Sequence, residues 1–426
     1  MKLKYNYLIF FLIFGQFSYH IVKFSLGPIT INTQLLASLI IFISSMYYVI
    51  ERRVAIQSAH RAVFFCFFVY VLLSTFSILY SDHHVNVELF GLWVTLVATF
   101  TLLLIFKCKD SLSLKKIANL IIVFAVVQAV LAILQFVFNH PIVPKDHAQE
   151  WGGRVINRVS GTYRDPFDFG FYLSVSTLLL LFGFFNSVMI SKYRYHLAVV
   201  FIAVIFLSQS LTNILGLVVS LILFFIFSNA KDKLILAKKT IYSLLLVFVF
   251  LIPLSFVFSN KIGLVISIVE SRLEQYSSAG DESRSLHLKV GYDMMQDSNY
   301  LGFGYGSYDL TSPMYVTDET FVGAKYINFF RDSIKPKMIS HSLPGAIMGE
   351  LGVLGLIIFF WFLISLIKPF WSWGRNNKYR LLYGCFCCLI ISRFMFYGFR
   401  LSDIFLFFLI FYFSSILALR EINEEI

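Results

Sequence analysis

Arginine and histidine side chains gather in two polar stretches, each of which ends where a long apolar run begins. The residues are Arg154, Arg158 and Arg164 in the first stretch, and Arg272, Arg284, His287 and His341 in the second. A guanidinium group binds phosphate oxygens through paired hydrogen bonds, so a set of arginines beside apolar runs favours binding of a lipid pyrophosphate. Each single arginine also fits a simpler role, in which it pairs with a carboxylate or reaches the membrane surface.

Long apolar helices must position these side chains. Hydrophobic residues make up 58% of the 426 residues, charged residues only 14%, and the mean hydropathy is +0.78. Soluble domains rarely have so few charges, and the apolar runs are long enough to cross a bilayer. The sequence therefore predicts an all-α polytopic membrane protein with about twelve transmembrane helices and a large helical loop on the outer face. The predicted spans are residues 7–24, 30–50, 62–80, 88–106, 117–138, 166–186, 197–210, 212–228, 241–259, 343–367, 381–398 and 403–419.

The net charge of +11 follows the connections between these spans. Lysine and arginine fill every second short connection, for example 229–240, whereas 25–29 and 81–87 hold neither. This alternation is the positive-inside rule, which places both termini in the cytoplasm and explains the charge without nucleic acid as a partner. The chain then divides into 1–138 with the first five spans, 139–259 with the first outer loop and the next four, 260–342 as the large outer loop, and 343–426 with the last three.

The apolar stretch 197–228 contains a polar group that decides the topology on either side. The group is Ser208, Gln209, Ser210, Thr212 and Asn213. A single helix through this stretch would reverse the orientation of the basic connection that follows. We therefore predict two short helices joined by a polar break, because polar backbone at membrane depth is tolerated where protein or a water-filled cavity surrounds it. Such a break is typical of a substrate site.

Two ionisable residues stand out inside predicted spans, Glu350 in the tenth and Arg393 in the eleventh. A charge in lipid is costly, so these side chains are expected to face a cavity or each other. A Glu350–Arg393 ion pair and a place in a substrate cavity remain open alternatives. In the large loop, 282–296 has the apolar spacing of a helix, and the run Gly302-Phe-Gly304-Tyr-Gly306 that follows favours a tight turn over a nucleotide-binding loop.

Three segments together resemble the O-antigen ligase and polymerase superfamily. They are Arg158-Val-Ser-Gly161-Thr-Tyr163-Arg164-Asp-Pro166, then Ser283-Arg284 with Tyr300-Leu-Gly302-Phe-Gly304-Tyr-Gly306-Ser-Tyr308, and His341 with Gly349-Glu350-Leu-Gly352-Val-Leu-Gly355. The first is similar to the family's first outer-loop motif, and the others to the start and end of its large periplasmic loop. The sequence departs from the family at Phe167 and Ser342, where members often have asparagine. Ligases commonly carry an arginine in the polar break, where this chain has Leu211 and Thr212, so the resemblance favours Wzy-type polymerases.

The resemblance implies an inverting glycosyltransferase in the bacterial inner membrane that needs no metal or other cofactor. Its donor is an oligosaccharide on undecaprenyl pyrophosphate, and its product is O-antigen, capsular polysaccharide or exopolysaccharide. The acceptor is another lipid-linked repeat unit in a polymerase and lipid A–core in a ligase. Arg158, Arg284 and Arg164 would bind the pyrophosphate, and His341 would be the general base. A chain-length regulator protein is an expected partner. The rival class, a flippase for lipid-linked sugar, is disfavoured because the sequence has no repeated halves.

Overall fold

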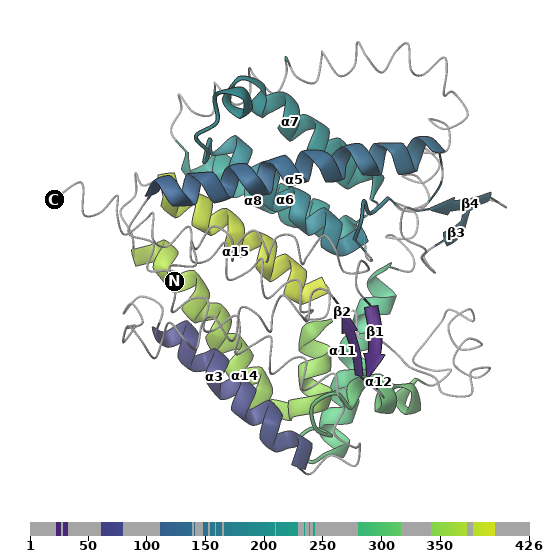
Figure 1. Ribbon diagram of the computed structural model, residues 1–426. Coiled ribbons are helices and arrows are strands. Elements are labelled where there is room, and N and C mark those ends of the chain that lie inside the picture. The colour runs from purple at the N-terminus through teal and green to yellow at the C-terminus, as the bar shows by residue number, and fades with distance from the viewer. Residues whose placement is uncertain are drawn as a thin grey trace.

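The computed structural model consists mainly of helices, with two short β-hairpins (Figure 1). The residues it describes are 23–26, 29–32, 61–79, 111–138, 140, 148–151, 154–157, 159–163, 166–208, 210–228, 234, 238, 242, 280–316, 342–372 and 378–396. Predicted spans at 88–106 and 403–419 lie outside these residues, as does all of 241–259 except residue 242.

Each described helix overlaps a predicted span or lies in the predicted large loop. They are α3 (Arg61–Leu79), α5 (Ser111–Phe138), α6 (Pro166–Leu181), α7 (Val188–Leu207), α8 (Leu211–Phe227), α11 (Gly280–Asp297), α12 (Tyr308–Thr311), the 3-10 turn η2 (Ser312–Tyr315), α14 (Leu343–Ser372) and α15 (Lys378–Phe396). Three stretches, Ala118–Phe138, Val188–Leu207 and Leu343–Trp371, are long and apolar enough to cross a membrane. The prediction of a helical membrane protein is therefore confirmed, while the number of twelve spans stays a prediction.

Two short antiparallel hairpins accompany the helices and leave the all-α fold class unchanged. Strands β1 (Lys23–Leu26) and β2 (Ile29–Asn32) pair with each other, and so do β3 (Ala148–Trp151) and β4 (Arg154–Asn157). The first hairpin occupies the end of the predicted span 7–24 and the start of 30–50. Each strand has four residues, which is too short for an alternating apolar pattern to distinguish it from the neighbouring apolar run.

The described helices form two groups that meet at α15 (Figure 1). Helices α6 and α7 pack against α5, and α8 packs against α6. In the other group α14 packs against α3 and α11. Helix α15 lies between the groups, because it contacts α8 on one side and α14 on the other. Helix α6, which follows the first predicted outer loop, also contacts α15, and α11 of the predicted large loop contacts α14.

The stretch 197–228 forms two helices, as the polar group in its middle predicted. Helix α7 ends at Leu207, and α8 begins at Leu211. Helix α7 also starts earlier than expected, at Val188, because the side chain of Ser187 caps it by accepting a hydrogen bond from the backbone N–H of Ile190. Lys192 and Arg194, which were expected in the preceding connection, therefore belong to α7.

Small residues allow α8 and α15 to pack closely in opposite directions. The Ser392 hydroxyl donates to the Thr212 carbonyl at 3.0 Å, and the Ser220 hydroxyl donates to the Cys385 carbonyl at 2.9 Å. Between them, a Cβ added to Gly216 would lie 3.1 Å from the Ser392 hydroxyl oxygen. Small and hydroxyl residues at helix contacts are how apolar helices associate where lipid removes the hydrophobic driving force.

Helix α14 is broken, although the sequence predicted one continuous span. Gly352 has φ 61° and ψ −150°, so the helix divides into a short first half and a long second half. The glycine-rich turn of the large loop fills the break. The backbone N–H groups of Phe303 and Gly304 donate to the carbonyls of Gly349 and Glu350 at 2.9 Å, and the N–H of Val353 donates to the Tyr300 carbonyl at 3.1 Å.

Candidate functional site

Two glutamines of α5 hold the first outer-loop motif. The Gln135 side chain accepts from the N–H groups of Ser160 and Gly161 at 3.0 and 2.9 Å and donates to the Gly161 carbonyl at 2.8 Å. Gln128 accepts from the N–H of Thr162 at 2.9 Å and donates to its hydroxyl at 2.8 Å. Gly161 has φ 57°, and a Cβ there would lie 2.1 Å from the side-chain amide oxygen of Gln128. The backbone between Arg158 and Arg164 is thus fixed to a transmembrane helix.

Tyr163 closes this loop against the start of α6. Its ring packs on those of Tyr172 and Phe169, with centroids 5.8 and 6.2 Å away. Burial, together with Tyr172 and Asp168, raises the pKa of the Tyr163 hydroxyl well above its ordinary value. This hydroxyl therefore stays protonated at neutral pH and is no candidate for the general base.

Arg393 of α15 contacts the first turn of α6. Its guanidinium forms an ion pair with Asp168 and donates to the Phe167 carbonyl at 2.9 Å. The same carbonyl accepts from the Asn213 side chain in the first turn of α8 at 2.7 Å. The polar break, the start of α6 and the end of α15 therefore meet at one carbonyl oxygen.

The expected Glu350–Arg393 pair is wrong. Arg393 pairs with Asp168, and the Glu350 carboxylate instead accepts from the backbone N–H of Tyr308, at 3.3 Å, and from that of Gly306. The pair was suggested because the two spans are neighbours in sequence. The Arg393 side chain of α15 instead contacts α6 rather than α14. Glu350 holds the end of the glycine-rich turn at the break in α14.

Helix α11 of the large loop crosses the first half of α14 at a glycine contact. A Cβ on Gly291 would lie 2.1 Å from the Gly345 carbonyl oxygen, and a Cβ on Gly345 would lie 2.5 Å from the carbonyl oxygen of His287. The buried His287 Nδ1 lies 3.0 Å from the Tyr308 hydroxyl, which donates to the His287 carbonyl at 3.1 Å. These contacts fix α11 one turn beyond Arg284.

The end of α11 is also tied to η2. The Tyr315 hydroxyl interacts with Asp297, and burial, followed by the carboxylates of Asp297 and Asp293, raises the pKa of Tyr315 to about 12. Met294 of α11 lies against Gly349, where a Cβ would be 3.0 Å from the methionine sulfur. The end of this described part of the large loop is thus fastened to α11, and α11 is fastened to α14.

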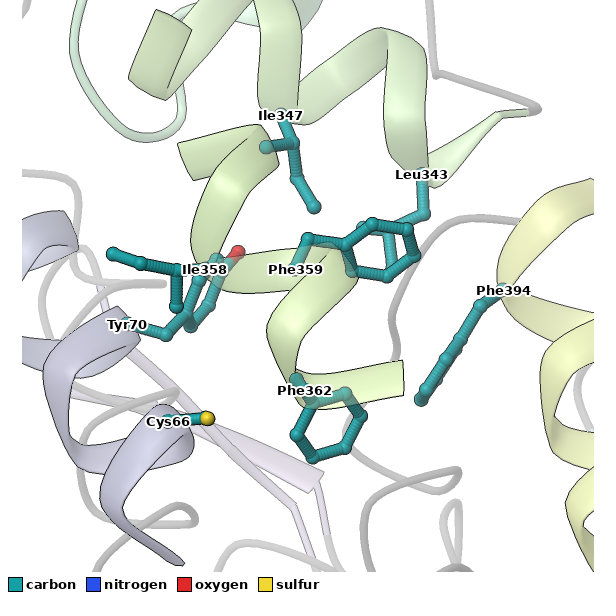
Figure 2. Close-up of a pocket in the computed structure, with 8 residues that line it drawn as sticks. All are labelled: Cys66, Tyr70, Leu343, Ile347, Ile358, Phe359, Phe362 and Phe394. Atoms are coloured by element: carbon teal, nitrogen blue, oxygen red, sulfur yellow. The ribbon is translucent and has the colours of Figure 1, made fainter. Parts of the chain in front are cut away.

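An apolar pocket lies where α3, α14 and α15 meet (Figure 2). Its lining residues are Cys66, Tyr70, Leu343, Ile347, Ile358, Phe359, Phe362 and Phe394. Figure 2 shows that residues from both halves of the broken α14 surround it. Two of these lining residues, Phe394 and Leu343, directly follow Arg393 and Ser342 in the sequence.

The structure describes residues next to the predicted site but not the predicted site side chains themselves. Arg158, Arg164 and His341 lie outside the described residues, and Arg284 lies in α11 without a described side chain. Ser342, next to His341, is buried and caps α14 by accepting from the N–H of Gly345 at 3.4 Å. Helix α11, which contains Arg284, contacts α14, which begins two residues after His341, whereas the placement of the four predicted side chains stays a prediction.

Several positioning residues were missed in the sequence. Gln128 and Gln135 lie seven positions apart, so they share one face of an apolar helix, and that spacing was the available signal. Asp168 lies inside the predicted span 166–186 and is a further ionisable residue in such a segment. Its partner could not be deduced, because Arg393 is separated from it by 225 positions.

A comparison with known protein families matches the middle of the chain. Residues 196–360 match the family model described as O-antigen ligase. No curated protein matches the chain. The matched residues include α8, α11 and the break in α14, and they contain two of the three segments that carried the resemblance in the sequence. Over these residues the chain is similar to the O-antigen ligase family, which supports the resemblance seen in the sequence.

Proposed function

We propose that the protein is a polymerase that joins oligosaccharide repeat units carried on undecaprenyl pyrophosphate, at the outer face of the bacterial inner membrane. One observation carries the proposal. The segment between Arg158 and Arg164 is fastened to α5 and continues into α6, whose start is bound to α15, while the helix of Arg284 is fastened to α14. The packing of α14 against α15 supports a shared site for the two arginine-bearing loops.

The chemistry needs only side chains of this kind. The acceptor hydroxyl attacks the anomeric carbon of the donor sugar, a new glycosidic bond forms, and the bond to the pyrophosphate oxygen breaks with inversion. Arg158, Arg284 and Arg164 would stabilise the negative charge that develops on the leaving undecaprenyl pyrophosphate. His341 would accept the proton of the attacking hydroxyl.

The polar break supports a polymerase over a ligase. In the break, the Asn213 side chain donates to the Ser210 hydroxyl and to the Phe167 carbonyl, and Arg393 is already paired with Asp168. The break thus offers no arginine of the kind that ligases commonly carry there. Transfer of the chain to lipid A–core is the second candidate function, which the description of the matched family favours.

A cell-free assay tests the proposal. The purified protein in liposomes is given fluorescent lipid-linked repeat units, with lipid A–core added to a parallel sample. A ladder of longer lipid-linked chains in both samples is the expected result. Label that moves to lipid A–core without chain growth would support the ligase. Label that changes leaflet without any new bond would support a flippase and contradict a glycosyltransferase.

A further inference from the structure

The ion pair between Arg393 and Asp168 lies within a bundle of apolar helices. Arg393 is 1% exposed, and its guanidinium lies 5.1 Å from the ring centroid of Phe171. Placing a charge in such surroundings is costly unless a partner and further hydrogen bonds compensate it. The carboxylate of Asp168 and the Phe167 carbonyl supply that compensation.

Neighbouring bonds extend this contact to a third helix. Asn213 binds the Phe167 carbonyl at 2.7 Å, and Ser392, next to Arg393, binds the Thr212 carbonyl at 3.0 Å. Two consecutive residues of α15 thus bind two different elements, the start of α6 and the start of α8. The start of α6 is therefore held from two sides.

We infer that Arg393 and Asp168 are positioning residues that fix the start of α6, and through it the outer-loop motif that ends at Pro166, in the geometry that pyrophosphate transfer requires. The inference rests on the proposed function. It assigns Arg393 no contact with the substrate, because its charge is matched by Asp168. The anion-binding role is left to the arginines of the loops.

A short segment of chain connects the residues held by α5 to the residue held by Arg393, so the Arg393–Asp168 ion pair can affect the position of that segment. Thr162 and Tyr163 are held by α5 and by the rings of α6, and Phe167 is held by Arg393. Only Arg164, Asp165 and Pro166 lie between these fixed points. If the second anchor is lost, the Arg164 backbone is free to shift. A shift of about 1 Å in a group that orients substrate can lower a rate roughly 100-fold.

The test uses the double substitution Arg393→Met with Asp168→Asn. Each single substitution leaves a buried charge without its partner and is expected to lower the yield of folded protein. The double variant removes both charges together, so it is expected to be recovered in wild-type yield after size-exclusion chromatography. In the chain-growth assay its kcat should fall roughly 10- to 100-fold. The single substitution Arg393→Lys keeps a positive charge beside Asp168, so its kcat should be much closer to the wild-type value than that of the double variant.

Arg380 supplies the matched control on the same helix. It is 8% exposed, it donates to the Phe370 carbonyl, and it lies 4.7 Å from the centroid of that ring, at the opposite end of α15. Arg380→Met therefore removes a buried arginine of similar contacts far from α6. Its kcat is expected to stay within about threefold of the wild-type value, since effects at sites without shared partners are separable.

Hydrogen–deuterium exchange gives a reading that needs no substrate. The peptide covering 158–168 should exchange roughly tenfold faster in the double variant than in the wild-type protein or in Arg380→Met. Unchanged exchange of this peptide, or an unchanged kcat in the folded double variant, would overturn the inference. A wild-type protein that makes no chains would instead overturn the proposed function, while the exchange measurement would still decide whether the pair positions the loop.

Discussion

At the scale of single residues, the best-supported feature is the attachment of the outer-loop backbone to α5. Gln135 binds three backbone groups of Ser160 and Gly161, and it is only 5% exposed. A buried backbone group that loses its partner costs about 1–3 kcal/mol. The uncharged side chain of Gln135 therefore stabilises the loop conformation through three backbone hydrogen bonds.

Gln135→Ala should consequently release the motif while leaving the apolar helix intact. We expect normal expression but chain growth lowered by roughly 10- to 100-fold, because the adjacent arginines lose their fixed backbone. Val130→Ala on an exposed position of the same helix is the control and should grow chains at the wild-type rate. Equal activity of the two variants would show that the loop needs no anchor on α5.

His341 provides a second prediction at this scale. His341→Ala should lower turnover by roughly 100-fold or more if its imidazole is the general base. The wild-type rate should also fall below about pH 6.5, the ordinary pKa of histidine, because the protonated ring cannot accept a proton. His140→Ala, an exposed histidine of the first outer loop, serves as the control. A pH profile that is flat from 5 to 8 would argue against a histidine base.

At the scale of elements, the glycine-rich turn belongs to the broken helix as much as to the loop. Gly302 and Gly306 have nearly the same φ, 81° and 80°. A Cβ on Gly302 would lie 2.4 Å from the backbone carbonyl carbon of Glu350, whereas one on Gly306 would meet nothing within 4 Å. The two positions thus share backbone strain and differ in the space around them.

These two glycines make a matched pair for a stability measurement. Gly306→Ala should cost about 1–3 kcal/mol through its left-handed backbone. Gly302→Ala carries the same strain and also forces the turn out of the break in α14, so its melting temperature should be lower by several degrees more. Thermal unfolding of the purified variants in one detergent gives the comparison. Equal melting temperatures would mean that the turn does not pack into the break.

The sequence predicted elements better than their partners. The apolar runs and the polar group at 208–213 predicted α3, α8 and the α7–α8 break, because these signals are local. The break in α14 was missed, since Gly352 stands in an apolar run and only the approach of Tyr300–Gly304 gives it a reason. The predicted partner of Arg393 was also incorrect, because the order of helices in the sequence does not determine which helices are neighbours in space.

At the scale of the whole molecule, the orientation in the membrane is a prediction from the alternation of basic connections. Single cysteines introduced at Ser278 and Thr317 should react with a membrane-impermeant reagent added outside, because both lie in the predicted large outer loop. Cysteines at Ala230 and Asn376 should react only after the membrane is opened. Labelling is compared with the parent chain, whose Cys66, Cys385 and Cys387 are buried. Outside labelling at Ala230 would reverse the predicted orientation of α8.

The two arginine-bearing loops are expected to meet over one lipid pyrophosphate, and a double-mutant cycle tests that claim most directly. Chain growth is measured for Arg158→Lys, Arg284→Lys and the double variant, with Arg272→Lys as a control. Lysine keeps the charge and loses the paired hydrogen bonds, so each single change should cost on the order of 100-fold in kcat/KM. If both groups hold the same leaving group, the double variant should lose clearly less than the product of the single losses. Wild-type chain growth by either single variant, or losses that multiply, would contradict a shared site.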